Sequence, residues 1–98
     1  MNSIVLVDQG STQKYPIDGI LDLHSFKPNE INSLIPEYIT ECLNRNILEI
    51  RIIHGKGKGI LRRGVQAILE KDPRVISFQT ANDRSSWGAT MVYLSRTV

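Results

Sequence analysis

A stripe of apolar side chains at helical spacing lies between two short apolar runs and constrains the fold more than any other feature. Its members recur at intervals of three and one residues, which places them on one face of an α-helix: Ile31, Leu34, Ile35, Tyr38, Ile39, Cys42 and Leu43. The flanking runs, Ile20 to Leu23 and Leu48 to Ile53, have the length of strands. A strand, a helix and a strand in this order predict two parallel strands joined by a crossover.

Prolines and asparagines mark the ends of this first helix. Pro28 is favourable in a first helical turn, so the helix is predicted to begin near Lys27 or Pro28. Pro36 lacks the amide that would bond to Asn32, and we therefore expect a kink or a later start of the helix. The stop is predicted at residues 44–46.

The second half of the chain adds a helix and then two strands. The pattern predicts a helix over Ile60 to Glu70, strands over Val75 to Thr80 and Thr90 to Leu94, and a polar loop between these strands. Helical crossovers imply parallel neighbours among the first three strands, whereas the last two are predicted to pair antiparallel. The order β-α-β-α-β-β predicts an α+β fold, a two-layer α/β sandwich in which a mixed four-stranded sheet has both helices on one face.

Length and apolar content indicate one domain without a membrane span. Residues 20–98 are expected to form it, and residues 1–19, with the apolar run Ile4 to Val7, to form an N-terminal arm or an extra edge strand. No apolar run approaches the roughly twenty residues of a membrane helix, and the N-terminus lacks the layout of a secretion signal. We expect a cytoplasmic protein, monomeric and without membrane contact. The lone Cys42 is expected to be a small buried side chain rather than a reactive thiol.

Basic residues are concentrated in one stretch. The whole chain has 12 basic and 10 acidic residues, a net charge of +2, which says little about partners. Residues 50–69, however, contain no acid and five bases: Arg51, Lys56, Lys58, Arg62 and Arg63. Such a cluster can neutralise the phosphates of a nucleic acid. The alternative is a solvated basic surface without a ligand.

Histidines stand at the ends of the first two predicted strands. The alternation of strand side chains places Asp22 and His24 on one face of the first strand, and His54 ends the second. Parallel strands bring their C-terminal ends to the same edge of a sheet, which is where open α/β sheets bind ligands. We therefore expect His24 and His54 to lie in one neighbourhood.

A glycine-rich loop follows His54 and precedes the second predicted helix. A helix N-terminus offers unpaired amides and about half a positive charge, and glycines let these amides approach an anion. Two lysines add positive charge, so phosphate is the expected ligand. The order of residues matches neither the Walker A loop nor the dinucleotide fingerprint, in which Ile60 would be glycine. The predicted phosphate site comprises Gly55, Lys56, Gly57, Lys58 and Gly59.

Two short motifs in this order resemble a known family. The stretch LDLHS at residues 21–25 and the stretch HGKGKG at residues 54–59 are followed by LRRGV, and together they resemble the small MutS-related (Smr) domain. The signatures of that family are an L-D-L-H-G-type strand end and an H-G-x-G or T-G-x-G loop. The resemblance extends from Leu21 to about Leu94. It places these residues at motif positions: Asp22, His24, His54, Gly55 and Gly57.

The resemblance implies both a fold and a function. The fold is that of the C-terminal domain of the third translation initiation factor, with strand order 1-2-4-3 and both helices on one side. The function is nucleic-acid binding and, in several members, endonuclease activity on DNA or RNA. Ser25 replaces the usual glycine, which could shift the turn and reduce activity, and the loop at residues 82–88 has one glycine where many members have several.

The first functional hypothesis is a nicking endonuclease that hydrolyses DNA or RNA phosphodiesters. His24 and His54 would divide the base and acid roles, because an imidazole titrates near neutrality. Lys56 and Lys58 would stabilise charge on the phosphoryl oxygens. Asp22 would orient a histidine or hold Mg²⁺ or Mn²⁺, with no tightly bound cofactor expected; its structural alternative is to accept hydrogen bonds from the glycine-rich turn.

Two further hypotheses remain open. A non-catalytic DNA- or RNA-binding module would contact phosphates through the same loop, Arg62 and Arg63, with Trp87 stacked on a base. Trp87 could instead anchor its own loop. A protein-interaction domain, in which the basic edge is incidental, is the third hypothesis.

Overall fold

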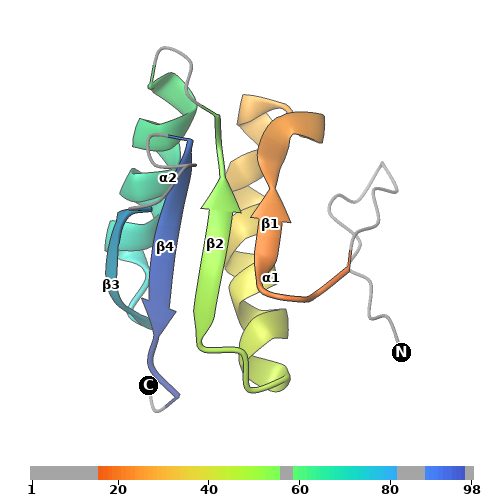
Figure 1. The fold of residues 1–98 in the computed structure, drawn as a ribbon, viewed down its shortest axis with the longest axis vertical. Coiled ribbons are helices and arrows are strands. Elements are labelled where there is room, and N and C mark those ends of the chain that lie inside the picture. The colour runs from red at the N-terminus through yellow and green to blue at the C-terminus, as the bar shows by residue number, and fades with distance from the viewer. Residues whose placement is uncertain (1–15, 56–58, 82–87, 97–98) are drawn as a thin grey trace.

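The computed structural model describes residues 16–55, 59–81 and 88–96, with only the backbone of Ser25. Figure 1 shows a single sheet with both helices behind it. Along the chain, the elements are β1 (Ile20–Asp22), two 3₁₀ turns (Leu23–Ser25 and Pro28–Glu30), α1 (Ile31–Asn44), β2 (Glu49–Ile53), α2 (Ile60–Lys71), β3 (Val75–Thr80) and β4 (Ala89–Leu94). The two-layer α+β fold with helices on one face is therefore confirmed.

The sheet is mixed and has the order β1-β2-β4-β3. β1 and β2 are parallel, with Ile20 opposite Arg51 and Asp22 opposite Ile53. β4 is antiparallel to both β2 and β3, so the last pair is as predicted. The expectation of parallel neighbours among the first three strands holds for β1 and β2 but is wrong for β2 and β3, because β4 lies between them. The strand order implied by the family resemblance is confirmed.

The core lies between the helices and the covered face of the sheet. The apolar stripe of α1 is buried there, and α2 contributes Val65 and Leu69, each at most 1% exposed. Cys42 is fully buried as expected, and burial raises the pKa of its thiol to about 11. The thiol is thus protonated at neutral pH and acts as a packing group.

The ends of α1 show how the sequence sets its length. Pro28 opens a 3₁₀ turn, and the α-helix begins at Ile31, three residues after the predicted start. Pro36 lies inside the helix and does not set where it begins. At the other end Asn46 has a φ of 60°. Its amide donates to the carbonyl of Leu43 (3.1 Å), and the amide of Ile47 donates to that of Cys42 (2.8 Å). This is the Schellman pattern of a helix C-terminus.

Residues 16–19, the described part of the predicted arm, pack onto the domain. Ile17 is 8% exposed within the core cluster. The Gly19 amide donates to the buried Tyr38 hydroxyl (3.0 Å), and its carbonyl accepts from the Arg51 amide (2.7 Å). Gly19 has a φ of 90°, and a Cβ there would lie 3.3 Å from the carbonyl oxygen of Glu49. Residues 1–15, with the predicted apolar run, lie outside the described residues.

No helix in the described ranges is long and apolar enough to cross a bilayer.

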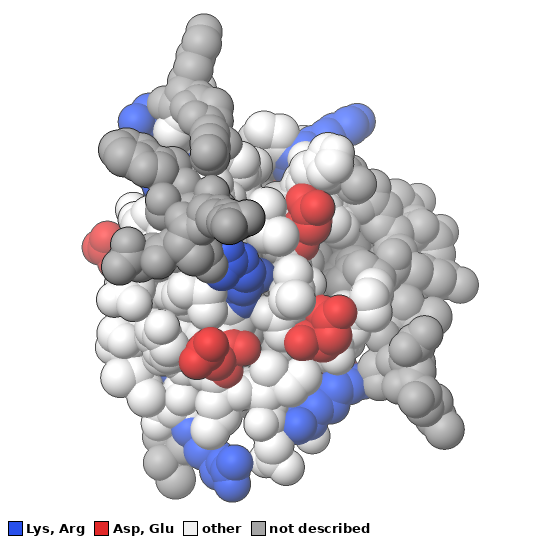
Figure 2. All heavy atoms as spheres, viewed as in Figure 1, with Lys and Arg blue, Asp and Glu red and all other residues white. Residues whose placement is uncertain are grey.

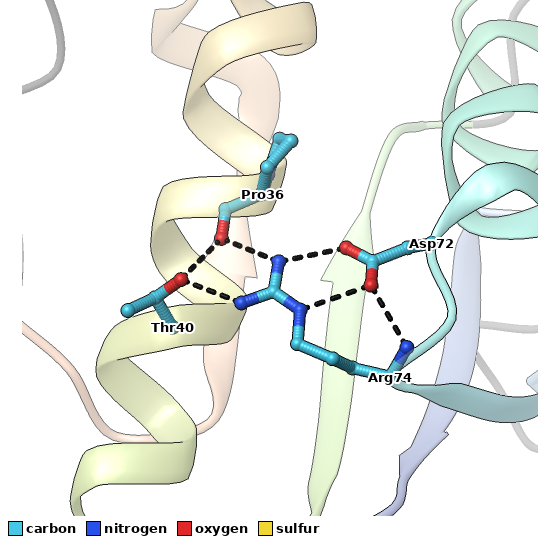
Figure 3. Close-up of polar contacts among 4 residues, drawn as sticks. All are labelled: Pro36, Thr40, Asp72 and Arg74. Carbon is cyan, nitrogen blue, oxygen red and sulfur yellow. Dashed lines mark hydrogen bonds and ion pairs between the residues drawn. The ribbon is translucent and has the colours of Figure 1, made fainter. Parts of the chain in front are cut away.

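Arg74 ties the helices to the start of β3, as Figure 3 shows. Its guanidinium donates to both carboxylate oxygens of Asp72 (2.9 and 2.8 Å), to the Thr40 hydroxyl (2.6 Å) and to the Pro36 carbonyl (3.1 Å). The hydrogen bonds from Arg74 hold the pKa of the Asp72 carboxyl below its ordinary value. This cation is therefore committed to the fold, although it borders a groove of about 490 Å³ between α1 and α2.

Replacement of Arg74 by methionine is expected to lower the free energy of unfolding by about 2 kcal/mol, because it leaves the carboxylate of Asp72 without its charged donor. The matched control is Arg45→Met, which breaks a partly exposed ion pair to Glu41 at the end of α1 and should cost about 0.5 kcal/mol. Urea unfolding at neutral pH measures both variants.

The pH dependence gives a second readout of the same pair. The carboxyl of Asp72 has a lower pKa in the folded state than in the unfolded state, so its contribution is present above the unfolded value and lost as pH falls through the folded one. The loss of unfolding free energy caused by Arg74→Met should therefore become smaller below about pH 4. If Arg74→Met and Arg45→Met lowered the free energy of unfolding by the same amount, this account would be contradicted.

Candidate functional site

The parallel pairing of β1 and β2 brings two distant sequence motifs to one edge of the sheet. Asp22, the last residue of β1, lies opposite Ile53, the last residue of β2. The next residues along each strand are Leu23 and His54, and the 3₁₀ turn that contains His24 contacts β2. The structure thus places the LDLHS and HG segments side by side, at the upper ends of β1 and β2 in Figure 1.

Asp22 and His24 form an exposed pair at this edge. The Asp22 Oδ1 atom accepts the backbone amide of His24 (3.0 Å) and lies 3.4 Å from the His24 Nδ1 atom. The two side chains are 53% and 80% exposed, respectively. Among the described residues, Asp22 makes no hydrogen bond to the glycine-rich turn. Its carboxylate therefore caps the 3₁₀ turn and lies beside the imidazole.

Ser25 fits this turn without backbone strain. The residue lies in the 3₁₀ turn Leu23–Ser25, and Asn46 is the only non-glycine with positive φ in the described ranges. A glycine is therefore not needed here for its left-handed conformations. The expected shift of the turn relative to other family members stays a prediction.

His54 is held by hydrogen bonds at both ring nitrogens. Its Nδ1 lies 3.1 Å from the carbonyl oxygen of Gly55, and its Nε2 lies 2.9 Å from the hydroxyl of Thr90. Because a carbonyl only accepts, the proton is on Nδ1. Burial, chiefly, and the nearby charge of Arg62 lower the pKa of His54, so the ring is neutral and its Nε2 accepts a hydrogen bond from the Thr90 hydroxyl. These bonds favour a supporting role for His54 over proton exchange with a substrate.

The glycines at the two ends of the loop have different surroundings. Gly55 has a φ of 88°, and a Cβ there would meet nothing within 4 Å. Its amide and that of His54 both donate to the carbonyl of Gly88 (2.9 and 2.8 Å), so these two amides are engaged. Gly59, with a φ of 82°, is the N-cap of α2 and has no side-chain cap. Among the described residues at this edge, the amides without an intrahelical partner are accordingly those of the first turn of α2.

Two arginine side chains lie over the start of α2. A Cβ on Gly59 would lie 3.4 Å from Arg63 Nη1 and 3.6 Å from Arg62 Nη2. Side chains of a helix point back toward its N-terminus, which explains why residues 62 and 63 reach Gly59. Neither arginine has an acidic partner within the described ranges. The other predicted site residues, Lys56, Gly57, Lys58 and Trp87, lie outside the described residues.

Comparison with known proteins identifies the family. The family model of the Smr domain matches residues 21–95. The chain belongs to the Smr domain family. The endonuclease MutS2 of Finegoldia magna is 35% identical over 76% of this chain, and the ribosome rescue factor SmrB of Aliivibrio fischeri is 35% identical over 83% of it. The matched regions are 10% and 46% of those proteins, so the chain corresponds to one part of each.

Solved structures share the fold. The Smr domain of Thermus thermophilus MutS2 superposes with a TM-score of 0.74 at 29% identity, covering 80% of this chain and 99% of that one. YdaL, a stand-alone small MutS-related protein from Escherichia coli, superposes with a TM-score of 0.71 at 26% identity, covering 78% and 63%. This chain is therefore an Smr domain of the type found in MutS2 and SmrB.

In the described residues of this Smr domain, Asp22 is the one carboxylate that the site edge offers to a Mg²⁺ or Mn²⁺ ion. Within the described ranges, no three potential ligands from His, Cys, Asp and Glu side chains come together. Asp22 supplies one carboxylate, and its Oδ1 already accepts the amide of His24. Mg²⁺ is commonly held by one or two carboxylates together with substrate phosphates and water. We therefore derive no chemical step through a metal.

Sequence reasoning missed Thr90 as a member of the site. Its hydroxyl is fully buried, and it reaches His54 from β4, the strand that inserts between β2 and β3. Thr90 lies opposite Ile52 in the sheet, two residues before the histidine. A lone threonine in an alternating strand carries no signal of this contact.

The Thr90→Val substitution is expected to leave the Nε2 atom of His54 buried and without a donor, at a cost of about 1–3 kcal/mol in the free energy of unfolding. Thr90→Ser keeps the hydroxyl and should cost much less. Nitrogen-15 NMR of the histidine rings should show His54 neutral at pH 7 with its proton on Nδ1 in the parent protein and in Thr90→Ser.

The same nitrogen-15 NMR measurement, repeated over a range of pH, tests whether the pKa of His54 is lowered. The unfolded state takes up a proton first, near pH 6.5, so stability should fall as pH drops below that value. A charged His54 ring at pH 7, or a proton on Nε2, would overturn the assignment.

Proposed function

We propose that this Smr domain is a nicking endonuclease that binds a backbone phosphate of DNA or RNA at the start of α2 and hydrolyses a phosphodiester with the Asp22–His24 pair. One observation carries the proposal. Within the described residues, two arginines without acidic partners lie over the start of α2, at the sheet edge where the Asp22 carboxylate lies 3.4 Å from the Nδ1 atom of the exposed His24. Relatives named endonuclease MutS2 support a nuclease.

The first part of the proposal is phosphate binding. The hydrogen bond from the Arg63 amide to the Gly59 carbonyl (2.9 Å) begins the helix, which leaves the amides of residues 60–62 for a ligand. The dipole of the 12-residue helix adds about half a positive charge at this end. The guanidinium groups of Arg62 and Arg63 supply mobile charge, and by their sequence position Lys56 and Lys58 are expected to add to it.

The second part is activation of water. The carboxylate of Asp22 holds the Nδ1–H tautomer of His24, so that Nε2 can take a proton from water. The oxygen of this water attacks phosphorus, the ester bond to the leaving oxygen breaks, and the leaving oxygen is protonated by the imidazolium or by solvent. The arginines and the helix amides stabilise the charge that grows on the phosphoryl oxygens. His54, with both nitrogens engaged, shapes the loop instead of supplying the proton.

A second candidate is a binding module without hydrolysis. The hydrogen bonds of His54 favour it, because they leave His24 as the only exposed imidazole at this edge in the described part of the chain. The phosphate contacts would then be the same, and only cleavage would be missing. A relative named as a ribosome rescue factor shows that Smr domains also occur in proteins with that role.

The test pairs cleavage with binding. Purified protein is incubated with supercoiled plasmid and with structured RNA, with and without Mg²⁺ or EDTA, and binding is followed by fluorescence anisotropy at several salt concentrations. His24→Ala should lower the cleavage rate by about 100-fold or more with binding retained. Asp22→Asn, which keeps an oxygen to cap the turn, should lower it by less. Cleavage should persist in EDTA.

The arginines have a matched control on the same helix. Arg63→Gln should weaken binding and reduce the slope of log K against log salt by about one, whereas Lys71→Gln, at the far end of α2, should change neither. Binding without cleavage would establish the second candidate. Cleavage that survives His24→Ala would point to a contaminant, and absence of binding to either polymer would favour a protein-interaction domain.

A further inference from the structure

A cavity adjoins the proposed phosphate site. It has a volume of about 340 Å³, which is at the lower end of the range of about 300–1,000 Å³ for small-molecule sites. Asp22 and His24 do not line it. Its lining residues are Pro28, His54, Gly55, Gly59, Ile60, Leu61 and Arg62.

The walls of this cavity are of two kinds. One wall is polar and comprises His54, Arg62 and the backbone of Gly55, whose Cα faces open space. The other wall is apolar and comprises Pro28, Ile60 and Leu61. Phosphate alone would use only the polar wall, because an anion gains nothing from aliphatic side chains.

Ile60 makes the apolar wall unusual for this surface. It is 64% exposed, and in the described ranges only Ile20 and Ile76 are comparably exposed large aliphatic residues. Those two lie on edge strands, whereas Ile60 is the first residue of α2, beside the free amides and Arg62. A single exposed isoleucine is ordinary, but one that lines a cavity together with Pro28 and Leu61 offers a ligand a continuous apolar contact.

We propose that this cavity holds the sugar and base of an unpaired nucleotide whose phosphate lies at the start of α2. The occupant follows from the two kinds of group at the cavity. The charge of Arg62 and the amides at the start of α2 fit a phosphate, and the aliphatic wall fits the flat face of the base attached to it. The inference rests on the proposed function and narrows its substrate to DNA or RNA in which at least one nucleotide is unpaired. In a duplex the base faces are stacked, and a base enters a cavity only after costly unstacking.

The experiment separates base contacts from phosphate contacts at equal charge. Fluorescence anisotropy with the full chain compares an oligothymidylate, an abasic oligonucleotide of the same length, and a blunt duplex, all at one salt concentration. The oligothymidylate should bind about tenfold more tightly than the abasic strand, and the duplex should resemble the abasic strand. An oligouridylate should behave like the oligothymidylate, because the proposed contact is to the base and sugar.

Ile60→Ala is the diagnostic variant. Because the side chain of Ile60 is exposed, the variant should fold like the parent protein, and circular dichroism checks this. It should weaken binding of the oligothymidylate by about fivefold and binding of the abasic strand by much less, because the substitution removes the side chain and keeps the backbone amide of residue 60. Ile76→Ala is the matched control, since Ile76 is 67% exposed on the edge strand β3 and should affect neither ligand.

The outcomes distinguish this inference from the proposed function. Equal affinity for the oligothymidylate and the abasic strand would refute the nucleoside site while leaving phosphate binding intact. A preference for bases that survives Ile60→Ala would place the base contact elsewhere and also refute it. Absence of binding to all three ligands would overturn the proposed function and this inference together.

Discussion

The parallel pairing of β1 with β2 is the constraint on which the rest of the structure depends. Three residues of β1 pair with β2, from Ile20 opposite Arg51 to Asp22 opposite Ile53. This register makes the LDLHS turn and the start of the glycine-rich loop neighbours, although about thirty residues of chain separate them. Gly19 supports the pairing from one side, because its amide and carbonyl bond to Tyr38 and Arg51. A slip of one residue would reverse the faces of β1 and bury the carboxylate of Asp22.

Most of the fold can be predicted from local patterns in the sequence. The stripe of α1 and the strand lengths predict element order, because burial of one helical face imposes a period of 3.6. Local patterns do not predict that β4 lies between β2 and β3, because this position depends on which strands can pair once both helices cover the sheet. The contacts that Arg74 makes with Thr40 and Pro36 could not be predicted for the same reason, because these residues lie more than thirty positions away and meet Arg74 only in the folded chain.

The candidate site was predictable in location but not in the roles of its residues. Strand-end histidines and a glycine-rich turn indicate the edge, but equivalent residue types there have different surroundings. His24 follows a strand that ends early in a 3₁₀ turn, which leaves its ring 80% exposed. His54 follows β2, beside β4 in the sheet, and the Thr90 hydroxyl of β4 is hydrogen-bonded to its Nε2 atom. The open sheet face in Figure 2 shows acidic and basic side chains interspersed, so charge alone does not mark the site on that face.

The central claim is that an anion binds at the start of α2. The most direct measurement is an amide NMR titration of the full chain with inorganic phosphate, at constant ionic strength. The account predicts saturable shifts at the amides of residues 59–62 and at the side chains of Arg62 and Arg63, with little change at Ala67, Lys71 and Arg74 in the groove between the helices. Shifts centred on that groove, or scattered changes that do not saturate, would contradict it.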